Sequence, residues 1–123
     1  MKIVALSQRV DFLPQRDEVR DSIDQRLINF ILECGGLSMP VPNTFSKLGY
    51  LSKWLRIVKP DAIILSGGAD IGSCSNRDHT DYALLDFAEK NKLPVLGICR
   101  GMQLMGVRGG VELKPCLLYT SPS

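Results

Sequence analysis

The sequence predicts an α/β protein built on a doubly wound, mostly parallel sheet. Short apolar runs alternate with segments of helical periodicity along the whole chain, which is typical of strand–helix–strand units. Two of these runs, Asp61–Leu65 and Val95–Ile98, lead directly into glycine-rich turns. The 123 residues, of which 45% are apolar and 23% charged, are enough for a single domain with its own core.

The N-terminal part is expected to contain a strand, a loop and a helix. The apolar run Lys2–Leu6 predicts the first strand, and the polar stretch Gln8–Arg20 predicts a loop. Asp21–Cys34 has helical spacing, Asp21 or Ser22 can cap its start, and two glycines follow its end. The apolar positions of this helix are Ile23, Leu27, Phe30 and Ile31.

The middle of the chain continues the alternation. Leu37–Val41 is predicted as the second strand, and a second helix is expected from about Ser46 to Val58, ending before Pro60. Asp61–Leu65 is the third strand, and a third helix covers roughly Thr80–Asn91. The side chains expected to point inward from the second helix are Leu48, Leu51, Leu55 and Val58.

The strand Val95–Ile98 leads into the most informative motif, Gly97-Ile98-Cys99-Arg100-Gly101, which is followed by a helical pattern. This is the form of a nucleophile elbow with cysteine in place of serine. A thiol at a helix N-terminus is favoured as the reactive thiolate, and the N–H of Arg100 can stabilise an oxyanion. The alternative, that Cys99 is an ordinary buried thiol, does not explain the two flanking glycines.

A second glycine loop, Ser66-Gly67-Gly68, follows the strand Asp61–Leu65. Any tight turn uses glycine, so this loop alone indicates little. Because carboxyl ends of parallel strands share one edge of a sheet, we expect it to lie near Cys99.

The run Gly97–Gln103, together with Ser66–Asp70 and Arg77-Asp78, resembles class I glutamine amidotransferases, and in particular the γ-glutamyl-γ-aminobutyrate hydrolase branch, peptidase family C26. The resemblance implies a flavodoxin-like fold and hydrolysis of γ-glutamyl amides through a thioester, without metal or organic cofactor. It also implies a role for each matching residue: Cys99 is the nucleophile, the N–H groups of Gly68 and Arg100 form the oxyanion hole, and Gly67 and Gln103 bind the substrate.

The same resemblance implies a His-x-Glu pair well downstream of the elbow, which this sequence does not contain. The single histidine, His79, lies upstream and is expected to be solvated. We therefore expect residues 1–115 to be the N-terminal part of the domain, truncated after the elbow helix and inactive alone. Residues 116–123 continue no pattern and are expected to be a non-native tail.

Two other functions stay open at this point. The same site could pass ammonia to a synthetase partner, as a glutamine amidotransferase does, or the chain could be a non-catalytic flavodoxin-like module. Arg77-Asp78 either forms a salt-bridged loop or contacts substrate, and a substrate-facing role for Arg20-Asp21 is a further alternative.

Composition narrows the choice of partners. The net charge of +2, with scattered basic residues, gives no case for nucleic acid, and no apolar run is long enough to span a bilayer. The N-terminus lacks the pattern of a signal peptide, so a cytoplasmic protein is expected. A small-molecule γ-glutamyl amide is the expected ligand, and a homodimer or a synthetase complex is possible.

The four cysteines have no C-x-x-C spacing, which argues against a zinc site and a disulfide framework. Cys34 is expected in the core, Cys74 in a loop and Cys116 in the tail.

Overall fold

The computed structural model describes residues 1–68, 72, 74–98 and 118–121. Its centre is a five-stranded sheet in the order β4-β1-β5-β6-β7, in which neighbouring strands from β4 to β6 are parallel. The strands are β1 (Lys2–Leu6), β4 (Gly36–Pro40), β5 (Ala62–Leu65), β6 (Val95–Ile98) and β7 (Leu118–Ser121). The predicted fold class, a doubly wound and mostly parallel sheet, is confirmed.

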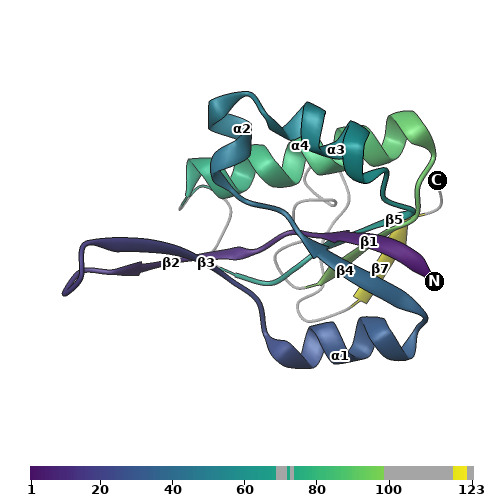
Figure 1. Cartoon of the computed structure of the whole chain (residues 1–123), viewed down its shortest axis with the longest axis horizontal. Coiled ribbons are helices and arrows are strands. Elements are labelled where there is room, and N and C mark those ends of the chain that lie inside the picture. The colour runs from purple at the N-terminus through teal and green to yellow at the C-terminus, as the bar shows by residue number, and fades with distance from the viewer. Residues whose placement is uncertain (69–71, 73, 99–117, 122–123) are drawn as a thin grey trace.

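Helices cover both faces of the sheet (Figure 1). Helix α1 (Gln25–Glu33) lies on one face, and α2 (Thr44–Leu48), α3 (Leu51–Val58) and α4 (Ser75–Asn91) lie on the other. Each face has its own apolar core, because alternate side chains of a strand point to opposite sides. Towards α1 the buried residues are Val4, Leu6, Ile31 and Ile64. Towards the other helices they are Ala5, Val41, Leu51, Leu55, Ile63, Leu65, Leu84, Leu85, Ala88 and Val95.

The segment predicted as a loop, Gln8–Arg20, is instead largely a β-hairpin. Strands β2 (Arg9–Leu13) and β3 (Glu18–Ser22) pair antiparallel and project from the body of the molecule (Figure 1). Apolar alternation in this segment is short, covering Val10 and Phe12, and neither side of the hairpin is buried.

Three helix boundaries also differ from the prediction. Helix α1 begins at Gln25 with Asp24 as its N-cap, so neither Asp21 nor Ser22 serves that role. The predicted second helix is two helices, because Gly49 has a left-handed backbone (φ 78°) and ends α2. Leu48 is therefore 62% exposed rather than inward-facing.

Helix α4 begins at Ser75, five residues before the expected start at Thr80. This extension brings Arg77 and Asp78 into its first turns. Their side chains therefore come from a helix and not from a loop.

Strand β7 pairs antiparallel with β6, joining Leu118 to Ile98 and Ser121 to Val95. Part of the segment 116–123 thus forms the edge of the sheet. Its expected non-native origin stays a prediction.

Candidate active site

The carboxyl ends of β1, β5 and β6 lie next to one another at one edge of the sheet. The register pairs Leu6 with Ile64 and Leu65 with Gly97, so these strands end almost level. The chain leaves them at Ser7, at Ser66 and after Ile98. This edge, which we call the rim, is where a doubly wound sheet binds ligands.

Of the predicted site residues, the structure places Gly67 and Gly68 at the rim. Gly67 is half-buried and Gly68 is exposed. Gly68 has φ 155°, a conformation that is accessible essentially to glycine alone. Cys99, Arg100 and Gln103 lie outside the described residues, so their roles stay predictions.

Two buried serines join the ends of β1 and β5. The Ser66 N–H donates to Ser7 Oγ at 2.9 Å, and Ser66 Oγ donates to the Ser7 carbonyl at 2.6 Å. Ser7 is fully buried and Ser66 is 5% exposed. Since buried polar groups need partners, these two bonds from Ser66 to Ser7 fix where the Ser66–Gly68 loop begins.

Arg77 lies directly beneath this loop. Its side chain is 3% exposed and its Nε donates to Asp81 Oδ2 at 3.0 Å, one helical turn away. Its Nη2 donates to the Ser66 carbonyl at 2.7 Å, and its Nη1 donates to the Gly67 carbonyl at 3.2 Å. Arg77 thus forms an ion pair with Asp81 within a helix and binds the loop backbone, so the predicted salt-bridged loop of Arg77 and Asp78 is wrong, and a substrate contact stays a prediction.

The next residue of the same helix, Asp78, binds Gly72, which comes four residues after Gly68. Asp78 Oδ2 accepts a hydrogen bond from the Gly72 N–H at 2.9 Å. The first turns of α4 therefore bind the backbone at Gly67 through Arg77 and at Gly72 through Asp78.

Asp21 binds protein groups close to the same edge. Its Oδ1 and Oδ2 accept from Asn43 Nδ2 at 2.9 Å and from the Asn43 N–H at 3.0 Å. Asn43 Nδ2 also donates to the Gln8 carbonyl at 3.0 Å. These bonds tie the hairpin to the segment that follows β4, which is a structural role for Asp21.

The remaining titratable candidates do not gather at the rim. His79 is exposed on α4. Cys34 is exposed, which makes its predicted core position wrong, and Cys74 is half-buried at the N-cap of α4. Among the described residues, no group of three or more His, Cys, Asp or Glu side chains could hold a metal ion.

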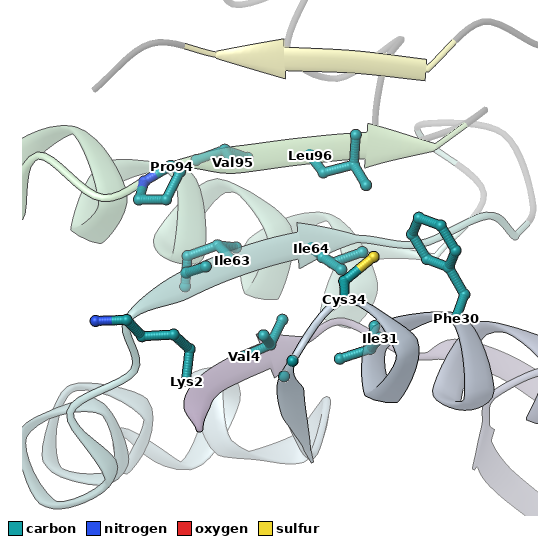
Figure 2. A pocket seen from close by; sticks show the side chains of 13 residues that line it. Lys2, Val4, Phe30, Ile31, Cys34, Ile63, Ile64, Pro94, Val95 and Leu96 are labelled. Carbon is teal, nitrogen blue, oxygen red and sulfur yellow. The ribbon is translucent and has the colours of Figure 1, made fainter.

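An apolar cavity of about 330 Å³ lies away from the rim (Figure 2). Phe30, Ile31 and Cys34 line it from α1 and the residue after it, and Ile64 and Leu96 line it from the sheet. It extends to Lys2 and Pro94, at the amino ends of β1 and β6, so it lies towards the opposite edge of the sheet from the glycine loop. Its lining is almost wholly apolar, and no histidine or carboxylate lies beside the Cys34 thiol among the residues that line it.

Comparison with known families agrees with this geometry. The family model for peptidase C26 matches residues 3–117. The chain belongs to the peptidase C26 family. The match includes both the glycine loop and the Gly-x-Cys-x-Gly motif of this peptidase C26 chain.

Similar curated proteins include both hydrolases and amidotransferases. γ-Glutamyl-γ-aminobutyrate hydrolase of Escherichia coli O157:H7 is 27% identical over 105 residues, covering 75% of this chain and 41% of the relative. A putative glutamine amidotransferase of Schizosaccharomyces pombe is 51% identical over 37 residues, covering 30% and 15%. The GMP synthase [glutamine-hydrolyzing] of Nitratidesulfovibrio vulgaris is 48% identical over 60 residues, covering 48% and 11%. The chain thus spans less than half the length of each of these relatives.

No helix within the described ranges has the length and apolar character needed to cross a membrane.

Proposed function

We propose that this peptidase C26 chain contributes the nucleophile and oxyanion donors of a γ-glutamyl amide hydrolase, with Cys99 as the nucleophile. The observation that carries the proposal is the parallel pairing of β5 with β6, in which Leu65 lies opposite Gly97. Because of this register, the glycine loop and the Gly-x-Cys-x-Gly motif start from adjacent strand ends.

The chemistry requires these two segments together. The Cys99 thiolate attacks the γ-carbonyl carbon, a C–S bond forms, and the carbonyl oxygen becomes an oxyanion that the N–H groups of Gly68 and Arg100 stabilise. The C–N bond then breaks and the amine leaves with a proton. Water hydrolyses the thioester to glutamate and restores the thiol.

Protonation of the leaving amine needs a general acid, and water needs a general base. Family resemblance assigns both tasks to a His and a Glu downstream of the elbow, but no histidine follows Cys99 in these 123 residues. A chain of these 123 residues would therefore acylate Cys99 slowly and hydrolyse γ-glutamyl amides poorly by itself. The E. coli relative, whose name describes a γ-glutamyl amide hydrolase, supports the reaction class.

Alkylation by iodoacetamide at pH 7, followed by peptide mass spectrometry, tests the nucleophile. Exposure alone would make Cys34 the fastest of the described thiols. We expect Cys99 to react faster than Cys34, and excess γ-glutamyl-p-nitroanilide to slow the reaction of Cys99 only. The Cys99→Ala variant controls for peptide assignment. Equal rates without protection would favour the non-catalytic flavodoxin-like module.

A second candidate is a glutamine amidotransferase that delivers ammonia to a synthetase. The 48% identity to a glutamine-hydrolysing GMP synthase over 60 residues supports it. Glutaminase activity that rises on addition of a synthetase partner would favour this alternative, whereas cleavage of γ-glutamyl amides without a partner would favour the hydrolase.

A further inference from the structure

We infer that Arg77 is a positioning residue for the oxyanion hole, acting by fixing the peptide unit that joins Gly67 to Gly68. This inference rests on the proposed function for its catalytic consequence, and on the described geometry for the positioning itself. Neither the family resemblance nor the relatives assign a role to Arg77.

One peptide plane links Arg77 to the Gly68 N–H. The Gly67 carbonyl and the Gly68 N–H belong to the same planar trans unit, so they point in opposite directions. Arg77 Nη1, which comes from α4, donates a hydrogen bond to the Gly67 carbonyl at 3.2 Å. The Gly68 N–H is therefore directed away from α4, and Gly68 is exposed at the rim. No described residue accepts a hydrogen bond from it.

The Arg77 guanidinium also holds the glycine loop rigidly. The guanidinium is a planar fork that can bind several acceptors in one fixed geometry. Here it binds Asp81, the carbonyls of Ser66 and Gly67, and the hydroxyl of Ser7, to which Nη2 donates at 3.2 Å. Arg77 thus ties the glycine loop to α4 and to the end of β1. An N–H held in this way needs no reorganisation when an oxyanion forms, which is the condition for efficient electrostatic catalysis.

The charge of the buried Arg77 side chain supports the same role. A buried ion pair loses its hydration, and an apolar pair of similar size often stabilises a protein equally well. Stability alone therefore does not explain a buried arginine here. The positively charged guanidinium that donates to the Gly67 carbonyl also polarises this peptide unit. The Gly68 N–H is thereby a stronger hydrogen-bond donor.

The test compares two reactions of the same thiol. Acylation of Cys99 by γ-glutamyl-p-nitroanilide, measured as a single-turnover release of p-nitroaniline, develops an oxyanion. Alkylation by iodoacetamide does not. In Arg77→Met we expect acylation to slow by about 10²–10³-fold, the usual effect of losing one oxyanion donor, and alkylation to change by less than about 3-fold. A merely structural role would slow both reactions together, and that result would overturn the inference.

Thr80→Val is the matched control. Thr80 is fully buried on the same helix, and its hydroxyl bonds the carbonyls of Asn43 and Asn76, not the glycine loop. We expect both reactions of this variant to stay close to those of the unmodified chain. Arg77→Lys retains a charge beside Asp81 without the fork, and it is measured in the same way if Arg77→Met does not fold; we expect a smaller selective loss of acylation.

Nuclear magnetic resonance separates failure of this inference from failure of the proposed function. If the unmodified chain shows no acylation of Cys99, the proposed function fails, and the Gly68 amide resonance still reports the position of the peptide. We expect that resonance to shift in Arg77→Met, or in Arg77→Lys, and to stay in place in Thr80→Val. An unmoved Gly68 amide in the arginine variants would overturn the positioning role.

Discussion

One arginine–carboxylate pair lies buried on α4 next to the rim, and another lies exposed on the β2–β3 hairpin. On the hairpin, the Arg20 and Glu18 side chains are 49% and 44% exposed, whereas those of Arg77 and Asp81 are 3% and 0% exposed. Water already solvates the hairpin pair, so pairing adds little. The buried pair has lost that solvation and depends on its partners. The same two chemical groups thus contribute little to the stability of the hairpin, whereas at the rim the buried pair holds the glycine loop in place.

Removing each arginine tests this contrast most strongly. We expect Arg77→Met to lower the free energy of unfolding by about 3–5 kcal/mol, because Asp81 stays buried without its guanidinium. Arg20→Met should lower it by less than about 1 kcal/mol. Urea denaturation followed by circular dichroism measures both. Similar losses for the two variants would show that burial does not distinguish the pairs.

The double variant Arg77→Met/Asp81→Leu sharpens the same measurement. It removes both charges, so we expect it to recover a large part of the stability lost in Arg77→Met. If the double variant is no more stable than Arg77→Met, the stability is lost through the loop contacts of Arg77 and not through the buried Asp81 carboxylate.

A matched pair of serines gives a smaller effect. Ser7→Ala removes the acceptor of the buried Ser66 N–H and one of the bonds of Arg77 Nη2, which should cost about 1–3 kcal/mol. Ser22→Ala removes only a half-buried bond from Ser22 Oγ to Asp11 on the hairpin, and about 0.5–1 kcal/mol is expected. Thermal unfolding of the two variants side by side measures the difference. A larger loss in Ser22→Ala would reverse the comparison.

Acid titration gives the smallest effect. The Ser22 hydrogen bond, helped by Arg9 and opposed by slight desolvation, holds the pKa of Asp11 below its ordinary value. A lowered carboxyl pKa stabilises the fold above the unfolded pKa, and this contribution is lost as pH falls through the folded pKa. Because Asp11 is 40% exposed, we expect less than about 0.5 kcal/mol. The stability difference between the unmodified chain and Asp11→Asn should shrink from about pH 5 towards pH 2; a constant difference would contradict this.

The sequence predicted the sheet well because its central strands β1, β5 and β6 carry short, nearly continuous apolar runs. It located β1, β6 and the glycine loop, and it placed β4 one residue too late. It missed the hairpin because Phe12 and Val19, 60% and 68% exposed, leave no buried face to produce a pattern.

Arg77 was harder to interpret for a different reason. Its i,i+4 spacing to Asp81 is visible in the sequence, but it has meaning only if the helix already includes both residues. Cys74, the N-cap of α4, makes no side-chain capping bond, and cysteine is not a preferred capping residue, so the residue type at this position does not indicate a helix start. The bonds from Arg77 to Ser7 and Ser66 span 70 and 11 residues, and no local pattern reveals them.

The position of β1 has a consequence for synthesis of the protein. It is synthesised before both of its neighbours, β4 and β5, yet it lies inside the sheet, where Val4 pairs with both Ser38 and Ala62. At about 5–20 residues per second, the nascent strand waits roughly 3–12 s for β5. For that time the backbone N–H and C=O groups of β1 that later pair with β5 are open to pairing with neighbouring nascent chains. Shielding by a chaperone matters most during this interval, before the 62nd residue has emerged.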